Sequence, residues 1–321
     1  MAVSQSSLSS SAAAVRASIM GGRRDVRGML LAGLLLACLL IAMLVLTVLL
    51  WDVLASAIPV FDSRSSGFFK GTMGSNPDRV GVSQGIWGSL MIAAFVIVLA
   101  FPIGIAAGVY LEEYATPGRL TSFIQLNIRN LAGVPSVVYG ILGLVVFVKA
   151  LAPLTGGRSV MSAGITMAIL VLPIVIITTA EAVRAVPDGL REAGYGVGAT
   201  RWETTRHHVL PYAAPGILTG TVLAVARALG EAAPLLLIGA ITGRLAAAPG
   251  QSLLDQLQGK FTAMPVVIFG WANNPNSPGK RTGLTFEDLN AAAIVVLLGM
   301  VLVLNAGAIV LRNRFERRRQ A

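Results

Sequence analysis

The sequence predicts an all-α membrane protein with six transmembrane helices and both termini in the cytoplasm. Three observations support this fold class. The composition is 55% hydrophobic and only 12% charged, with a mean hydropathy of +0.75, so the average residue prefers hydrocarbon to water. Apolar runs long enough to cross about 30 Å of hydrocarbon recur along the chain. Arginines gather in the segments that this topology places inside, as the positive-inside rule expects.

The N-terminal part contains a tail, a first span and a polar connection. Residues 1–27 begin with a Ser- and Ala-rich stretch without apolar periodicity, and we expect a disordered cytoplasmic tail. Residues 28–51 form an apolar run longer than the core of a cleavable signal, which is about 7 to 15 residues. We therefore expect a retained transmembrane helix there. Residues 52–84 hold balanced charges with Gly, Ser and Pro, which indicates an extracytoplasmic loop.

The following part of the chain, residues 85–311, is interpreted as one transmembrane domain with the other five spans. The expected spans are residues 85–111, 131–148, 161–180, 215–241 and 289–311. A polar segment at residues 181–214 lies between two of them, and it offers helical sequence on both sides of a Gly-containing break. Five arginines mark residues 312–321 as a basic cytoplasmic tail.

The long connection at residues 242–288 contains a further apolar stretch. It includes Met264, the run 266–269 and Trp271. This pattern suggests an amphipathic helix at the outer membrane interface. A gate, or a floor on which an extracytoplasmic partner sits, fits the same pattern equally well.

Composition and motifs exclude several classes of function. The net charge of +10 is explained by topology and not by nucleic-acid binding, because the arginines lie between apolar spans. The single Cys38 cannot form an internal disulfide, and the adjacent His207 and His208 lack further metal ligands. The chain has no G-x-x-x-x-G-K-[ST], H-E-x-x-H or G-x-S-x-G motif. We expect no catalysis by this chain and no cofactor bound to it.

Arg227 and Glu231 are the candidate substrate-pathway residues. In a helix that begins at Pro215, Arg227 lies about 18 Å along the axis and Glu231 about 6 Å further, so both are near the middle of the membrane. A spacing of four residues places the two side chains on one helix face. Arg227 is the only Lys or Arg deep within a span, and it is therefore the group expected to meet an anion. A purely structural ion pair is the alternative.

Proline and glycine interrupt several of the expected spans. These residues are Pro102, Gly104, Gly133, Pro135, Gly140, Pro173 and Pro234. Broken helices often line substrate paths, because their free backbone groups bind ions. Kinks and close packing points in ordinary membrane helices have the same composition, so the interruptions do not decide the function.

The polar segment resembles the EAA signature of bacterial ABC importer permeases. The matching residues are Glu192, Ala193, Gly194, Gly198, Leu210 and Pro211. The chain departs from the signature at Gly194, where alanine is usual, and at His208, where an aliphatic residue is usual. In that family the segment is the coupling helix, which fits a groove of the ATPase subunit.

Further stretches resemble the PstA-type permeases of phosphate importers. They are residues 110–114, 130–140, 227–236 and 268–272, and the Glu-x-Ala-Pro-Leu-Leu ending of the third separates the chain from the sister permease type. The resemblance covers residues 85–311. It implies a multi-pass protein of the bacterial inner membrane that takes up inorganic phosphate. The implied partners are a PstC-type permease in a heterodimer, two PstB-type ATPases that use ATP and Mg²⁺, and a PstS-type phosphate-binding protein.

Other functions agree with parts of the pattern. A permease for another oxyanion would have the same broken helices and the same arginine. A proton-coupled secondary transporter would use Glu231 as its proton carrier, but it has no use for the coupling signature. A membrane scaffold or sensor subunit would not depend on Arg227 for transport.

Overall fold

The computed structural model describes residues 26–241 and 253–320, and this part of the chain contains helices and their connections but no strand. Five of its helices are long and apolar enough to cross a membrane, and a bent pair of helices raises the number to six. The all-α membrane fold predicted from the sequence is therefore confirmed. The chain divides into two compact units, residues 1–52 and residues 53–321.

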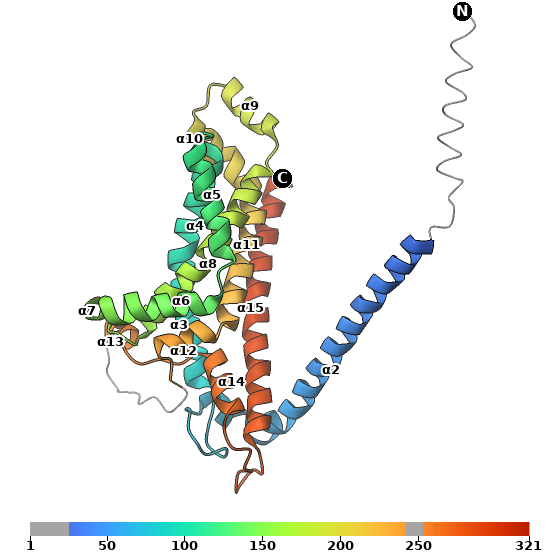
Figure 1. Cartoon of the computed structure of the whole chain (residues 1–321), viewed down its shortest axis with the longest axis vertical. Helices are drawn as coiled ribbons and strands as arrows, with labels where there is room; N and C mark the ends of the chain where they lie inside the picture. The colour runs from blue at the N-terminus through green and yellow to red at the C-terminus, as the bar shows by residue number, and fades with distance from the viewer. Residues whose placement is uncertain (1–25, 242–252, 321) are drawn as a thin grey trace, which may run out of the picture. The chain divides into compact units, whose positions relative to one another are not determined.

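The helices follow one another along the chain as labelled in Figure 1. The first half contains α2 (Val26–Lys70), α3 (Ser83–Phe95), η1 (Val96–Ala100), α4 (Phe101–Val109), η2 (Tyr110–Tyr114), α5 (Arg119–Ala132), α6 (Ser136–Gly143), η3 (Leu144–Ala150) and α7 (Ala152–Thr155). The second half contains α8 (Val160–Arg184), α9 (Asp188–Gly196), α10 (Arg201–Thr204), η4 (Thr205–Val209), α11 (Leu210–Gly230), α12 (Ala233–Ile238), α13 (Leu253–Leu257), α14 (Met264–Ala272) and α15 (Phe286–Gln320). The η elements are π-helical turns that continue the α-helices beside them.

Helix α8 is the central span of the larger unit. In its apolar window 67% of the residues are buried, far more than in any other candidate span. Glycines on the neighbouring helices allow the close approach: a Cβ added at Gly104 would lie 2.7 Å from Val175, and one added at Gly108 would lie 2.7 Å from Thr179. The hydrophobic effect does not drive helix association inside a bilayer. Close van der Waals packing at small residues stabilises the contact between the helices instead.

The described part of the first unit is the N-terminal portion of α2, residues 26–52. Its side chains are apolar and exposed on almost every face of the helix over residues 26–52, as expected of a helix surrounded by lipid. Of the predicted tail at residues 1–27, residues 1–25 lie outside the described residues, and the last two already belong to α2.

The predicted loop at residues 52–84 is wrong in its first half, because α2 continues to Lys70 with a kink at Arg64. The side chains of Ala57, Val60 and Phe68 are buried in an apolar cluster with Trp271 and other residues. Their spacing is helical, but the charged and Gly/Ser residues between them obscured it. Burial of this face against the rest of the unit stabilises the helix where local composition favours a loop.

The prediction of one straight span at residues 131–148 is also wrong, both in its start and in its continuity. The chain turns by 97° between α5 and α6, so the span consists of two helical pieces with the break at residues 133–135. Pro135 is the cause: it disfavours helical geometry at the residue before it, and its own backbone is extended, with ψ 136°. Most of the first piece, α5, precedes the expected start of the span.

The apolar stretch at residues 264–271 lies in α14, and most of its side chains are buried in the protein and not along a single face. Met264, Val267 and Trp271 are at most 1% exposed. Glycines on α3 make room for the stretch, since a Cβ added at Gly85 would lie 2.8 Å from Val267. The backbone N–H of Met264 donates a hydrogen bond to Ser89 Oγ at 2.9 Å.

The basic C-terminal tail predicted at residues 312–321 is helical as far as Gln320, because α15 continues without a break. Arginine favours the helix about as well as leucine does, so leaving an apolar environment does not end the helix. In Figure 1, the C-terminus and helices α9 and α10 lie at the same end of the helix bundle.

Candidate transport site and coupling segment

Arg227 and Glu231 lie at a break in the fifth predicted span. Helix α11 ends at Gly230, and Glu231 adopts extended backbone angles, with φ −85° and ψ 116°. The expectation of one continuous helix through both residues is therefore wrong. Pro234 explains the break, because it cannot donate to the carbonyl of Gly230 and its ring collides with the preceding turn. The two side chains nevertheless meet, with Arg227 Nε 3.5 Å from Glu231 Oε1.

The Arg227 side chain is 45% exposed, whereas that of Glu231 is 21% exposed. Both lie in or next to a membrane-spanning helix. A charged group facing lipid near the middle of a bilayer costs at least about 2.5 to 3.5 kcal/mol. This cost requires that protein or water, and not lipid, covers Arg227 in the membrane.

A second broken span packs against the first. A Cβ added at Gly140 of α6 would lie 2.7 Å from the Cα of Pro234. One residue earlier, the buried Tyr139 donates a hydrogen bond from its hydroxyl to the carbonyl of Leu131 at 2.9 Å, across the bend between α5 and α6. The two interruptions that the sequence marks separately, at Pro135 and Pro234, are thereby brought into one packing unit. The sequence gives no individual role to Tyr139, which lies within the stretch 130–140.

The predicted coupling segment at residues 181–214 contains the last turn of α8, then α9, a turn, and the start of the helix that begins at Arg201. Glu192 and Ala193 are exposed on α9, whereas Gly194 is buried against α10, where an added Cβ would lie 2.7 Å from Thr204 Oγ1. Residues 201–214 belong to the same uninterrupted helix as the fifth span, which runs from Arg201 to Gly230. This second half of the segment thus continues directly into the fifth span. Leu210 and Pro211 lie inside this helix, directly after the π-helical turn η4.

Gly198 holds the turn between α9 and α10. Its φ of +83° lies in the left-handed region, where a side chain is unfavourable, and its N–H donates to the carbonyl of Tyr195 at 3.0 Å. An added Cβ at Gly198 would meet no atom within 4 Å. The glycine is therefore required by backbone conformation and not by space.

Two acidic residues of the stretch 110–114, to which sequence reasoning gave no individual role, connect this segment to the bundle. Glu113 of η2 is 4% exposed and accepts hydrogen bonds from Arg191 Nη2 at 2.8 Å and Nε at 3.1 Å. The neighbouring Glu112 accepts a hydrogen bond from Arg184 Nε at 3.1 Å. The only local signal is the acidic pair itself, because its basic partners are more than 70 positions away.

The Arg191 guanidinium is anchored on several sides. It also donates to the carbonyls of Val183 at 2.9 Å and Val186 at 2.7 Å. Burial lowers the pKa of Arg191, but the hydrogen bond and the charge of Glu113, together with Asp188, outweigh it and raise the pKa above the ordinary arginine value. The guanidinium therefore remains charged and fixes the start of α9 to the end of η2.

Apolar side chains are exposed around the turn between α9 and α10. Val197 is 84% exposed, Trp202 is 57% exposed and Tyr195 is 45% exposed. All three lie in or next to the turn between α9 and α10 (Figure 1). Exposed aromatic residues of this kind are typical anchors of a protein interface.

Within residues 26–241 and 253–320, no three His, Cys, Asp or Glu residues gather as a metal site.

Comparison with known proteins agrees with this architecture. The chain is 34% identical over 240 residues to the phosphate transport system permease protein PstA 1 of Mycobacterium tuberculosis, which covers 75% of this chain and 72% of the relative. It is 31% identical over 257 residues to the PstA protein of Yersinia pestis, with 80% and 81% covered. A solved bacterial ABC transporter involved in the import of alginate shares the fold, with a TM-score of 0.60, 15% identity and coverage of 91% of this chain and 99% of that chain.

The family model that matches residues 100–321 is described as the binding-protein-dependent transport system inner membrane component. The match includes the coupling segment, both broken spans and the final span. The chain therefore belongs to this family, the inner-membrane permeases of ABC importers.

Proposed function

We propose that this chain is the permease subunit of an ATP-driven importer that moves inorganic phosphate from an extracytoplasmic binding protein into the cytoplasm. The exposed guanidinium of Arg227 at a helix break is the observation that carries the proposal. Phosphate oxygens accept paired hydrogen bonds from a guanidinium, which gives both charge compensation and orientation. The names of the two relatives support phosphate as the anion.

The second permease completes the pathway. Arg227 is exposed about one turn before the end of α11. A PstC-type permease that packs against this end of α11 removes Arg227 from lipid and leaves a path between the two subunits. Glu231 neutralises Arg227 while the path is empty, and an arriving phosphate replaces it as the partner of the guanidinium.

The end of the bundle with α9 and α10 is the surface for two PstB-type ATPases, and this end faces the cytoplasm. Tyr195, Val197 and Trp202 supply the exposed apolar contacts. ATP and Mg²⁺ bind to the ATPases, since this chain has no phosphate-binding loop. Movement of α9 passes to η2 through the Arg191–Glu113 pair, and movement of α10 passes along the continuous helix toward Arg227. The resulting rigid-body motion opens the path alternately to the two sides.

Uptake by the complete transporter tests the proposal. Proteoliposomes that contain both permeases and the ATPases are supplied with the PstS-type protein loaded with radioactive phosphate, with ATP inside. We expect uptake that requires ATP and the binding protein and that excess sulfate does not compete. Equal competition by sulfate would show that the substrate class is oxyanions in general and not phosphate alone. Uptake driven by a pH gradient through this chain without ATPases would instead establish the proton-coupled transporter.

A further inference from the structure

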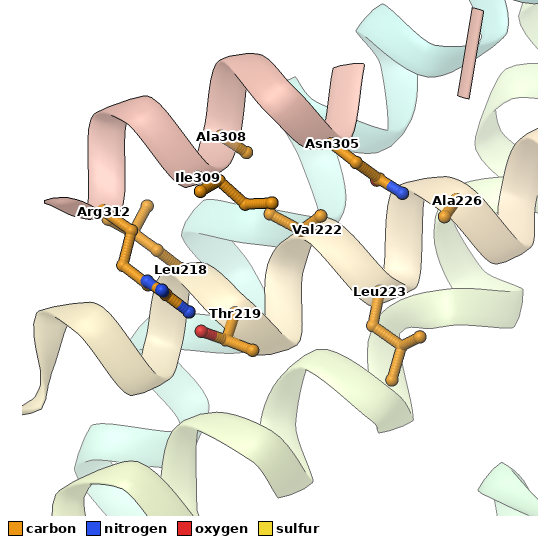
Figure 2. Close-up of a pocket in the computed structure, with 9 residues that line it drawn as sticks. All are labelled: Leu218, Thr219, Val222, Leu223, Ala226, Asn305, Ala308, Ile309 and Arg312. Carbon is orange, nitrogen blue, oxygen red and sulfur yellow. The ribbon is translucent and has the colours of Figure 1, made fainter. Parts of the chain in front are cut away.

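A groove of about 300 Å³ runs between α11 and α15, next to the helix face that carries Arg227. Figure 2 shows the side chains that line it. The lining residues are Leu218, Thr219, Val222, Leu223 and Ala226 from α11, and Asn305, Ala308, Ile309 and Arg312 from α15. Nothing in the proposed transport cycle uses this groove.

The groove has apolar walls and one charged end. Leucine, valine, isoleucine and alanine side chains form its length. Arg312 and Thr219 lie together at one end, and Asn305 and Ala226 lie at the other (Figure 2). Arg312 is also the first of the five arginines that close the chain, so the charged end is where α15 passes from apolar to basic sequence. That transition corresponds to the boundary between hydrocarbon and headgroups.

The shape favours a flexible chain over a helix. Asn305 and Arg312 are two turns apart, about 10 Å along the axis of α15. The groove holds about 300 Å³ over this length, whereas a helix about 10 Å across occupies roughly 800 Å³ over the same length. A hydrocarbon chain can therefore lie inside the groove, whereas a helix of another subunit can only cover it.

We propose that the groove binds an anionic phospholipid. One acyl chain lies against Val222, Leu223 and Ile309, and the phosphate of the headgroup lies at Arg312. Charge complementarity selects this occupant: an apolar slot that ends in a guanidinium at the headgroup level matches a lipid with an anionic head. The neighbouring Arg314 is exposed and does not line the groove, so the site is distinct from the general attraction of the basic end for anionic lipid.

Native mass spectrometry of the purified transporter complex tests this site. The complex is equilibrated in detergent with phosphatidylglycerol or with phosphatidylcholine, and bound lipid is counted. We expect retention of phosphatidylglycerol over phosphatidylcholine, reduced about five-fold by Arg312→Gln and kept by Arg312→Lys. Ala308→Trp fills the groove and is expected to remove the lipid while Arg312 remains. The matched control, Arg314→Gln, is expected to leave retention unchanged.

Several results would overturn the proposal. If Arg314→Gln lowers the retention of phosphatidylglycerol as much as Arg312→Gln does, the lipid is held by non-specific attraction to the basic end. If phosphatidylcholine is retained equally well, the charge of the headgroup has no role. A photoreactive phenylalanine analogue at Leu223 in native membranes must crosslink to lipid. If it crosslinks to the second permease instead, that subunit is the occupant. Displacement of phosphatidylglycerol by inorganic phosphate alone would make Arg312 a site for the free anion.

Discussion

Arg191 contacts Glu113 across 78 positions of sequence, with Nη2 2.8 Å from Oε1 and the carboxylate almost completely buried. This pair joins the start of the coupling segment to the end of the second predicted span. Glu112 and Arg184, one residue and seven residues away, form a similar bridge, but the Arg184 side chain is 55% exposed. The two pairs therefore form a natural comparison between a buried and an exposed connection.

Replacing Glu113 by glutamine is expected to destabilise the connection and uncouple transport. The largely buried Arg191 loses its buried charged partner and keeps only the exposed Asp188, which costs about 2 kcal/mol. We expect a lower Tm of the purified complex and ATP hydrolysis that no longer drives proportionate uptake. Glu112→Gln is the control, because an exposed pair contributes only about 0 to 1 kcal/mol. Equal effects of the two substitutions would contradict a special role for the buried pair.

Gly198→Ala is expected to distort the turn between α9 and α10 at a cost of about 1 to 2 kcal/mol, because alanine disfavours a φ of +83°. The chain should still insert into the membrane, while co-purification of the ATPase decreases. Gly196→Ala is the matched control, since Gly196 is helical and an added Cβ would meet no atom within 4 Å. Normal ATPase recovery with Gly198→Ala would show that the turn geometry does not determine docking.

Arg227→Gln is expected to reduce phosphate uptake by about 30-fold or more, since removing a desolvated charge from an ionic contact costs about 2 kcal/mol or more. Glu231→Gln should have a smaller effect, because it removes the competitor of phosphate and not its ligand. Initial uptake rates of the reconstituted complex measure both. Arg119→Gln, at the exposed start of α5, controls for loss of positive charge. Wild-type uptake rates in both variants would mean that Arg227 and Glu231 form a structural ion pair and do not contact the substrate.

Gly140→Ala is expected to separate α6 from α12, because the new Cβ would lie 2.7 Å from a backbone atom of Pro234. Overpacking of this kind costs about 1 to 3 kcal/mol. Uptake should fall together with the Tm of the complex. Gly133→Ala in the nearby bend is the control, because its Cβ would make an ordinary contact at 3.5 Å. If both variants transport normally, contact between the two broken spans is not needed for transport.

Asp78 accepts hydrogen bonds from the Thr282 hydroxyl at 2.8 Å, from the Thr282 N–H at 3.0 Å and from the Arg281 N–H. This clamp between two loops is expected to depend on pH. The hydrogen bond from the Thr282 hydroxyl lowers the pKa of Asp78 most. Partial desolvation of the carboxylate opposes this effect, and the backbone N–H groups of Thr282, Arg281 and Lys280 lower the pKa further. Because the folded pKa is below the ordinary value of 3.8, the stabilisation is present above that value and is lost as the pH falls through the lowered pKa.

Hydrogen exchange of residues 279–285 measures this effect after correction for intrinsic rates. Protection is expected at neutral pH and should be lost on acidification toward the lowered pKa. Asp78→Asn should remove much of the protection at neutral pH, whereas Asp62→Asn, on the exposed part of α2, should leave it unchanged. Equal protection in the wild type and Asp78→Asn would exclude the clamp.

The sequence by itself determined the properties that depend on local composition. Long apolar runs define membrane spans because a bilayer requires about 20 apolar residues in succession. Gly198 and Pro234 were recognisable because glycine and proline restrict or permit backbone angles by their own chemistry. Arg227 stood out because a charge within an apolar run is costly wherever the run is placed.

The tertiary structure alone decided which distant groups meet. Residues 53–70 contain enough polar residues to suggest a loop, but burial of Phe68 and its neighbours makes them helical. The stretch at residues 264–271 is buried because glycines on α3 leave room for it. The partners of Glu113 and Tyr139 follow from packing and not from spacing. Such contacts depend on the arrangement of whole helices, and a local pattern of residues contains no information about that arrangement.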